Sequence, residues 1–269
     1  VLIDQEGGRV ARLKPPHWRQ YPNARTLAEE SEEAVYSGAR LIADELLPLG
    51  INVDCLPLAD VPVEGSHDII GDRAYATNPQ DVARFARKAA EGLRDGGVLP
   101  VLKHIPGHGR AMVDSHEDLP VVSASLEELE RTDFIPFKAL NDLPLGMTAH
   151  VLYEALDKEN VATLSATVIR YIREQIGFDG LLMSDDISMK ALNGDFADLS
   201  HRTLVAGCDL VLHCNGDMAE MEAIASAVSP LSDAAKRRAQ HAWKQGALRQ
   251  PFDVAAAEAR IHALLAESA

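Results

Sequence analysis

Short apolar runs alternate with longer segments of helical periodicity along the 269-residue chain. The candidate strands are the apolar runs at residues 1–3, 51–53, 98–102, 145–148, 180–183 and 210–212. Between them, apolar positions recur at helical spacing in residues 29–47, 80–95, 125–140, 165–176 and 218–228. This alternation is typical of βα units around a parallel sheet and predicts an α/β fold.

Polar residues follow each of the predicted strands. Asp4 follows the first strand and Asp54 the second, Lys103 and His104 follow the third, and Asp185 comes just after the fifth. The carboxyl ends of parallel strands share one edge of a sheet, so we expect these side chains to converge. Such convergence favours a (β/α)8 barrel, in which active sites lie at that edge.

The number of predicted strands is six, whereas a (β/α)8 barrel contains eight. Either two βα units precede Val1 in the natural protein, or the sheet is open and doubly wound. No linker-like stretch divides the chain, and 46% of its residues are hydrophobic. We therefore expect one domain over residues 1–269 with a single core. Its C-terminal helices are expected over about 218–269, and the alanine-rich part, 232–268, should wrap the outside.

Composition narrows the range of partners and compartments. The net charge is −15 and there is no basic run, which argues against nucleic acid and against an anionic membrane surface. We expect a small, neutral partner. Cys55, Cys208 and Cys214 are too few for a disulfide framework and lack the spacing of a zinc site, so we expect them to pack in a reducing, cytoplasmic compartment. No apolar run approaches the roughly 20 residues that span a bilayer.

The densest group of chemically active residues begins at the end of the third predicted strand. Lys103 and His104 are placed to bind a substrate hydroxyl or phosphate, although Lys103 could instead form a buried ion pair with an acidic strand end. Position at a strand end favours binding. His108 lies between two glycines, and we interpret it as a residue that shapes the loop.

Asp114 and His116 follow in the same loop. Two residues apart, they can contact each other if the loop turns, and a carboxylate beside an imidazole fixes its tautomer and raises its basicity. The alternative is a solvated acidic loop, because Glu117 and Asp118 come next. The residues by themselves slightly favour that alternative.

Two adjacent carboxylates follow the fifth predicted strand. If that strand alternates, Asp185 and Asp186 face opposite ways, so one can act in a pocket while the other supports it. The alternative is that these residues cap a helix beginning near Ser188.

The first strand end combines Asp4 with two arginines, Arg9 and Arg12, on a loop hinged by glycines. This combination suits a sugar, because hydroxyl groups both accept from arginine and donate to a carboxylate. Histidines and aspartates at strand ends could also hold zinc. No His-x-His pair occurs on the first strand and no His-Glu-x-x-His motif is present, so we rank a metal site second.

Five motifs carry a resemblance to a known family. In order, they are DQEGGRV at 4–10, GDRAY at 71–75, KHIPGHG at 103–109, DSH at 114–116 and SDDISM at 184–189. Together they resemble the ordered motif set of the family 3 glycoside hydrolases, and more closely that of the bacterial β-N-acetylhexosaminidases of peptidoglycan recycling. Two positions depart mildly from the commonest motifs, with Ile105 where phenylalanine is usual and Asp72 where glutamate is frequent.

The resemblance implies a (β/α)8 barrel whose first two βα units lie before a strand like residues 1–3, which matches the deficit of two strands. It implies that Asp185 is the nucleophile and that His116, paired with Asp114, is the general acid/base. The residues that it implies hold the N-acetylglucosamine unit are Asp4, Arg12, Arg73, Lys103 and His104. It implies neither a cofactor nor a metal.

The implied reaction is the retaining removal of a terminal, non-reducing N-acetylglucosamine, with N-acetylglucosaminyl-1,6-anhydro-N-acetylmuramic acid and its peptides as the expected substrates. Three alternatives stay open. A phosphorylase of the same family would use phosphate in place of water, since a histidine base repels an incoming anion less than a carboxylate does. The others are a metal-dependent barrel hydrolase and a sugar-binding barrel without activity.

Overall fold

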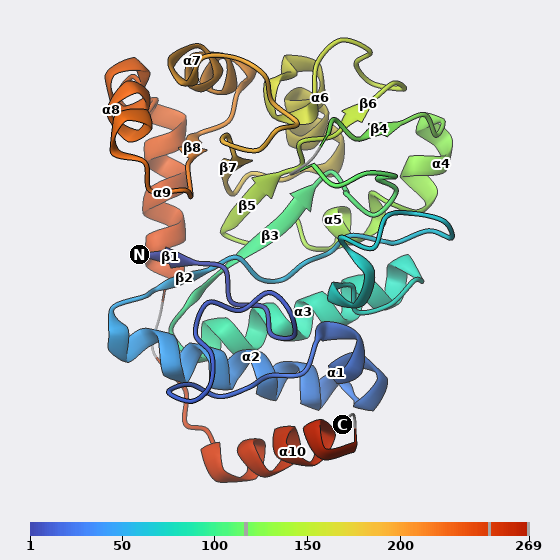
Figure 1. Ribbon diagram of the computed structural model, residues 1–269, viewed down its shortest axis with the longest axis vertical. Helices are drawn as coiled ribbons and strands as arrows, with labels where there is room; N and C mark the ends of the chain where they lie inside the picture. Colours follow the sequence, from blue (N-terminus) through green and yellow to red (C-terminus); the bar gives the residue numbers. More distant parts are fainter. Residues whose placement is uncertain (116–117, 247–248, 268–269) are drawn as a thin grey trace.

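A six-stranded parallel sheet forms the centre of the computed structural model, which describes residues 1–115, 118–246 and 249–267 (Figure 1). The strands lie in the order β1 (Leu2–Ile3), β2 (Val53–Asp54), β3 (Leu99–Ile105), β5 (Leu145–Thr148), β7 (Leu181–Asp186) and β8 (Leu210–Leu212). All six predicted strands are confirmed; those at 145–148 and 210–212 have the predicted bounds, and the other four have shifted bounds. Ile105, three residues beyond the predicted third strand, is the last residue of β3.

Strand order distinguishes the two folds that the sequence left open. Each strand of the sheet pairs in parallel with the next one along the chain, as Leu2 does with Val53 and Met147 with Met183. A doubly wound sheet reverses its order at a switch point, and this curled sheet has no reversal. The barrel-type α/β fold is therefore confirmed, with six strands in the main sheet among the described residues; that further βα units precede Val1 stays a prediction.

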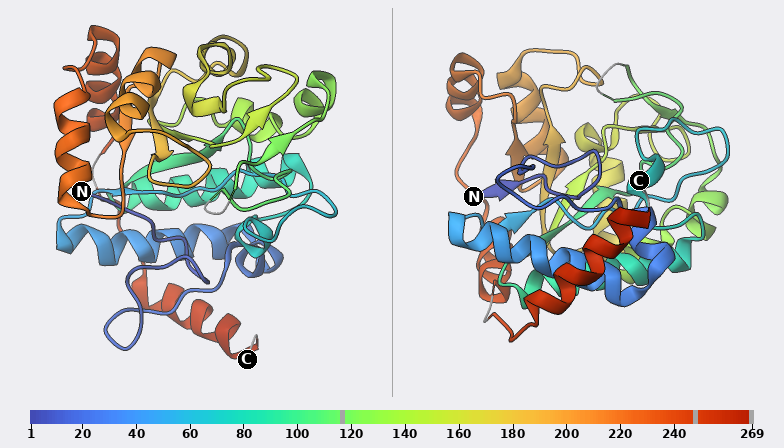
Figure 2. Two further views of the ribbon diagram at one scale, coloured as in Figure 1. Left: turned by 45° about the horizontal axis from the view of Figure 1, so that its top comes forward. Right: turned by 60° about the horizontal axis from the view of Figure 1, so that its bottom comes forward.

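Helices surround the sheet, most of them on its convex side. The longer ones are α2 (Glu32–Leu46), α3 (Pro79–Asp95), α7 (Phe196–Ala206), α8 (Met218–Ala227), α9 (Asp233–Gln245) and α10 (Val254–Glu267). Helices α2 and α3 pack side by side below the sheet, and α10 contacts α2 on the side away from the sheet (Figures 1 and 2). None of the described helices is long and apolar enough to cross a membrane.

Helix boundaries differ from the predicted ones where a side chain competes for backbone hydrogen bonds. The segment expected as one helix near residue 29 is divided at Ser31, which ends α1 (Ala24–Glu30) and caps α2 by accepting from the Ala34 amide at 3.1 Å. The segment 125–140 likewise forms two helices, α4 (Leu126–Arg131) and α5 (Ile135–Ala139), and α5 begins with a proline in its first turn. Helix α7 was not predicted.

Shorter elements complete the fold. The segment 165–176 forms α6 (Ala166–Tyr171), which continues as a π-helix over Ile172–Ile176. Single 3-10 turns occur at Leu47–Leu49, Gly71–Arg73 and Ala162–Leu164. Two strands that were not predicted, β4 (Val121–Val122) and β6 (Leu152–Tyr153), pair in parallel apart from the main sheet.

The two faces of the sheet pack against different partners. Leu102 and Leu182 belong to the large core shared with the covering helices, whereas Val101 and Met183 point to the concave side, as alternation along a strand requires. Ala242 of α9 packs into the concave cluster, and Figure 1 draws α9 beside β1 and β8. The expectation that 232–268 wraps the outside is right for α10 and wrong for α9, whose alanine face is small enough to reach the inner wall.

Candidate active site

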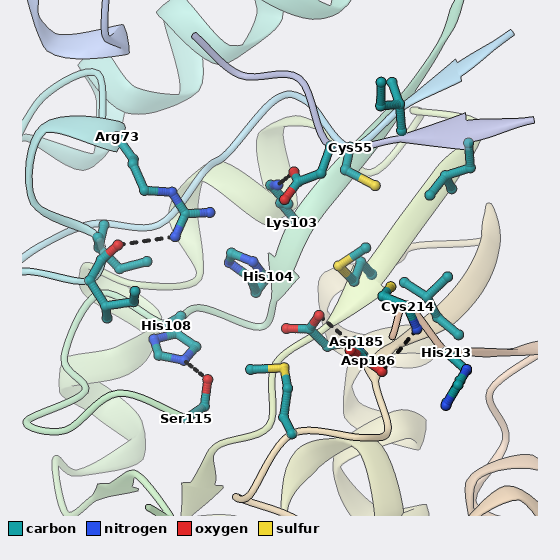
Figure 3. A pocket seen from close by; sticks show the side chains of 18 of the residues that line it. Cys55, Arg73, Lys103, His104, His108, Ser115, Asp185, Asp186, His213 and Cys214 are labelled. Atoms are coloured by element: carbon teal, nitrogen blue, oxygen red, sulfur yellow. Dashed lines mark hydrogen bonds and ion pairs between the residues drawn. The ribbon is translucent and has the colours of Figure 1, made fainter. Parts of the chain in front are cut away.

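A pocket of about 680 Å³ opens at the carboxyl ends of the strands (Figure 3). Six of the expected site residues line it together: Asp4, Arg12, Arg73, Lys103, His104 and Asp185. Of the other two, His116 lies outside the described residues, and Asp114 is described but is not part of the lining. The convergence predicted from the strand ends therefore holds for Asp4, Lys103, His104 and Asp185, whereas the roles of these residues are not tested by their placement.

Asp185 stands at the end of β7 with its carboxylate in the pocket (Figure 3). Its Oδ1 accepts from the Asp186 amide at 2.8 Å. Burial alone would raise the pKa of Asp185, but His104 and His150 beside it outweigh that effect and hold the pKa below its usual value. The side chain is therefore an ionised carboxylate at neutral pH, the form that a nucleophile requires.

Asp186 also borders the pocket, but its carboxylate is engaged elsewhere. Oδ1 accepts from the amides of Ser188 at 3.0 Å and Cys214 at 3.2 Å, while Oδ2 accepts from the Ser188 hydroxyl at 2.8 Å. Both carboxylates therefore border the pocket, and Asp186 also supports the loop; that Asp185 is the one that acts stays a prediction. The alternative of a helix cap is wrong, because the residues after Asp186 form turns and not a helix.

The opposite wall of the pocket is a network of opposite charges. Lys103 Nζ lies 2.6 Å from Asp4 Oδ1 and 2.5 Å from Glu6 Oε1. Arg73 forms a bidentate ion pair with Glu6, in which Nη2 donates to Oε1 at 2.7 Å and Nε donates to Oε2 at 2.9 Å. Arg12 Nη2 is 3.7 Å from Asp4 Oδ2. Lys103 forms the buried ion pair that the sequence left open and also lines the pocket, whereas its binding of a substrate stays a prediction.

The opposite charges in this wall stabilise one another's ionised forms, although burial disfavours those forms. Burial would raise the pKa of Glu6, but the positive charges of Lys103 and Arg73 outweigh it and hold that pKa far below its usual range. Burial would likewise lower the pKa of Lys103, and Asp4 and Glu6 raise it above its usual value. At neutral pH the wall therefore presents fixed ammonium and guanidinium donors.

Asp54, expected at the same edge, is fully buried and outside the pocket lining. Burial raises its pKa well above the usual range, which favours the protonated acid. Its Oδ1 accepts from the Gln5 amide at 3.0 Å. Gln5 Oε1 in turn accepts from the amides of Arg12 and Leu13 at 2.7 and 3.0 Å, so this chain of contacts holds the Arg12 loop.

Sequence reasoning missed two acidic residues that organise the pocket. Glu6 was part of the first motif but was not selected, although it lies only two residues beyond Asp4. Asp60 was overlooked; its Oδ2 lies 2.7 Å from His104 Nδ1. The apolar run 55–59, which ends at this acid, is the signal that could have indicated it.

His108 is more than the loop-shaping residue that we expected. It is buried in the pocket wall, and its Nε2 lies 3.2 Å from Ser115 Oγ (Figure 3). Burial, with the nearby His104, lowers the pKa of His108 to about 4, so the ring is neutral at pH 7. Ser115, the residue before His116, thereby forms part of the pocket. The predicted contact between Asp114 and His116 stays a prediction.

No group of three or more histidine, cysteine, aspartate or glutamate side chains is arranged to hold a metal ion within residues 1–115, 118–246 and 249–267.

Known proteins resemble this chain over most of its length. The β-hexosaminidase of Methylococcus capsulatus is 39% identical over 223 residues, which are 80% of this chain and 66% of that protein. The β-hexosaminidase of Bordetella avium is 34% identical over 226 residues, 80% of this chain and 64% of that protein. The chain thus spans less than two thirds of the length of these curated relatives.

Solved structures agree with the sequence comparison. The crystal structure of NagZ from Neisseria gonorrhoeae in complex with N-trifluoroacetyl-D-glucosamine matches with a TM-score of 0.85 and 31% identity, covering 98% of this chain and 80% of that one. Residues 1–243 match the family described as the glycosyl hydrolase family 3 N-terminal domain. With the fold, the pocket and the relatives in agreement, the chain belongs to glycosyl hydrolase family 3.

Proposed function

We propose that this protein is a retaining β-N-acetylhexosaminidase that removes a terminal, non-reducing N-acetylglucosamine. The observation that carries the proposal is the position of Asp185, whose ionised carboxylate faces the charged wall of Lys103 and Arg73 across one pocket. The names of the relatives, all β-hexosaminidases, give independent support. So does the N-trifluoroacetylated glucosamine bound in the neisserial structure.

The reaction proceeds in two displacements. In the first, an Asp185 oxygen bonds to the anomeric carbon as the bond to the leaving oxygen breaks, and His116 gives that oxygen its proton. In the second, water attacks the same carbon, His116 takes the proton of the water, and the bond to Asp185 breaks. Two inversions leave the β configuration unchanged. The ordinary imidazole pKa, near 6.5, suits a group that gives and then takes a proton near neutrality.

The hydroxyls of the sugar would be held by Asp4, Arg12, Arg73, Lys103 and His104. N-acetylglucosaminyl-1,6-anhydro-N-acetylmuramic acid and its peptides are the proposed natural substrates, and the cytoplasm is the proposed compartment of this recycling step. The placement of Ser115 in the pocket wall supports a role for the residue that follows it in the chain.

The nucleophile is tested by changing Asp185 to asparagine and measuring hydrolysis of an aryl β-N-acetylglucosaminide. We expect kcat/KM to fall by about a thousandfold or more, because an amide does not attack the anomeric carbon. Asp186→Asn is the matched control, since its carboxylate serves the turn at Ser188 and an amide can keep most of those contacts. Hydrolysis by Asp185→Asn near the wild-type rate would rule out this nucleophile.

The acid role is tested by the leaving group. His116→Ala should slow substrates with poor leaving groups far more than activated aryl substrates, which need little protonation. Equal losses for both would contradict a general acid at His116. Release of the α-anomer first would contradict retention, and formation of a sugar phosphate in phosphate buffer would favour the phosphorylase.

A further inference from the structure

The His104 ring is held from behind by a buried carboxylate. His104 Nδ1 lies 2.7 Å from Asp60 Oδ2, and Asp60 is fully buried. The other oxygen, Oδ1, accepts from the backbone amides of His104 at 3.3 Å and His108 at 2.6 Å. The His108 ring contacts the His104 ring edge-on at 5.6 Å between centroids. Orientation of the His104 ring is therefore fixed from two sides.

This geometry determines which ring nitrogen carries the proton. Oδ1 is occupied by two donors, so the hydrogen bond to the ring is made through Oδ2. Burial would raise the pKa of Asp60, but His104 and His108, with the hydrogen bonds from the His104 ring and the His108 amide, outweigh burial and hold the pKa below its usual value, so the group is a carboxylate that only accepts. Nδ1 must then donate. In a neutral ring with a proton on Nδ1, Nε2 carries a lone pair.

We propose that Asp60 is a positioning residue that fixes His104 as a hydrogen-bond acceptor for one hydroxyl of the sugar. The inference rests on the proposed function and names a determinant of its specificity. Lys103 and Arg73, on the same wall, offer only donors. His104 complements them: it requires a ligand group that donates, which a hydroxyl satisfies and a fluorine or an ether oxygen does not.

Asp60→Asn reverses the polarity of His104 with little change in shape. The two backbone amides need an acceptor, so the asparagine oxygen takes the place of Oδ1 and its amino group takes the place of Oδ2. That amino group donates to Nδ1, and the proton of a neutral ring moves to Nε2. His104 then presents a donor to the pocket.

The tautomer is measured on the whole chain by long-range ¹H–¹⁵N correlation of histidine-labelled protein at pH 8. The His104 signals are assigned by their absence in His104→Gln. We expect an Nδ1-protonated ring in the wild type and an Nε2-protonated ring in Asp60→Asn. An Nε2-protonated ring or an imidazolium in the wild type, or the same tautomer in both proteins, would overturn the proposal. This readout does not depend on activity.

A second experiment compares the binding of N-acetylglucosamine with that of its 3-, 4- and 6-deoxyfluoro analogues. In the wild type, one analogue should bind about tenfold more weakly or worse, because its fluorine faces the Nε2 lone pair. In Asp60→Asn that ratio should fall to about threefold or less. His104→Gln, whose amide can donate or accept, should discriminate least.

The two proposals fail in different ways. Equal discrimination by wild type and Asp60→Asn, or none in the wild type, would overturn the assignment of His104 as an acceptor even if hydrolysis proceeds. Absence of both N-acetylglucosamine binding and hydrolysis would contradict the proposed function, and the tautomer measurement would then decide the role of Asp60 by itself.

Discussion

Glu6 is the residue on which the charged wall of the pocket depends. It is buried between Lys103 and Arg73 and contacts both, so each positive side chain owes part of its position to this one carboxylate. Removing one partner of a buried ion pair leaves the others without compensation, which costs more than the pair itself contributes. The effect of a substitution here should therefore exceed that at an exposed acid.

Glu6→Gln keeps the size of the side chain and removes its charge. We expect the free energy of unfolding, measured by urea denaturation at pH 7, to fall by about 3 kcal/mol, together with a weaker affinity for the sugar. Glu127→Gln is the control, because the pair that Glu127 makes with Arg131 is exposed, and the change should alter stability by less than about 0.5 kcal/mol. Equal losses for both variants would contradict the central role of Glu6.

The same variant predicts a pH dependence. The pKa of Glu6 is lowered in the folded protein, whereas in the unfolded chain it is about 4.3. Its contribution to stability is thus complete above the unfolded pKa and is lost as the pH falls towards the folded one. The stability difference between wild type and Glu6→Gln should shrink progressively below about pH 4.3. A difference that stays constant from pH 7 to pH 3 would contradict this account.

At the scale of elements, the contact between α2 and α3 depends on a glycine. A Cβ added at Gly92 of α3 would lie 2.4 Å from the Tyr36 carbonyl oxygen and 3.0 Å from the Arg40 amide nitrogen, both in the backbone of α2. Backbone atoms cannot move aside as a flexible side chain can, so the two helices would have to separate. The sequence pattern predicted both helices but not this close approach.

Gly92→Ala should lower the free energy of unfolding by about 1–3 kcal/mol in a denaturant titration, although alanine favours a helix by about 1 kcal/mol over glycine. The matched control is Gly38→Ala in α2, where the nearest atom is the flexible Leu27 Cδ1 at 3.1 Å. That change should be neutral or stabilising by up to about 1 kcal/mol. A stabilised Gly92→Ala would show that the helices are not in such close contact.

For the molecule as a whole, closure of the concave face depends on α9. The inner side chains of β3, β5 and β7 form a cluster that Ala242 enters and that Ala239 borders. The two edge strands, β1 and β8, are only half-buried. Within the described residues they do not pair with each other, so the sheet stays open between them. We infer that α9 supplies apolar cover beneath the pocket.

Ala242→Asp places a carboxylate in this apolar cluster without a partner. We expect it to lower the free energy of unfolding by about 2–4 kcal/mol and to lower the melting temperature, because an unpaired buried charge is costly. Gln240→Asp, on the exposed side of the same helix, makes the comparison and should change stability by less than about 0.5 kcal/mol. Similar effects at both positions would contradict the packing of α9 on the inner wall.

The sequence by itself determined the six strands, their parallel βα order and the polar residues that follow them, because strand alternation and helical periodicity are local properties. The motifs likewise identified Asp4, Arg73, Lys103, His104 and Asp185, which the fold brings into one pocket. These residues are recognisable because each lies at a strand end or in a distinctive motif.

Only the tertiary structure decided which groups act on those residues. Asp60 contacts His104 across 44 positions of the chain, and Glu6 contacts Arg73 across 67. No local pattern specifies such pairs, because they depend on how strands and loops far apart in sequence are placed against one another. The burial of Asp54 and the position of α9 on the concave face could not be predicted for the same reason, because both depend on how distant segments pack.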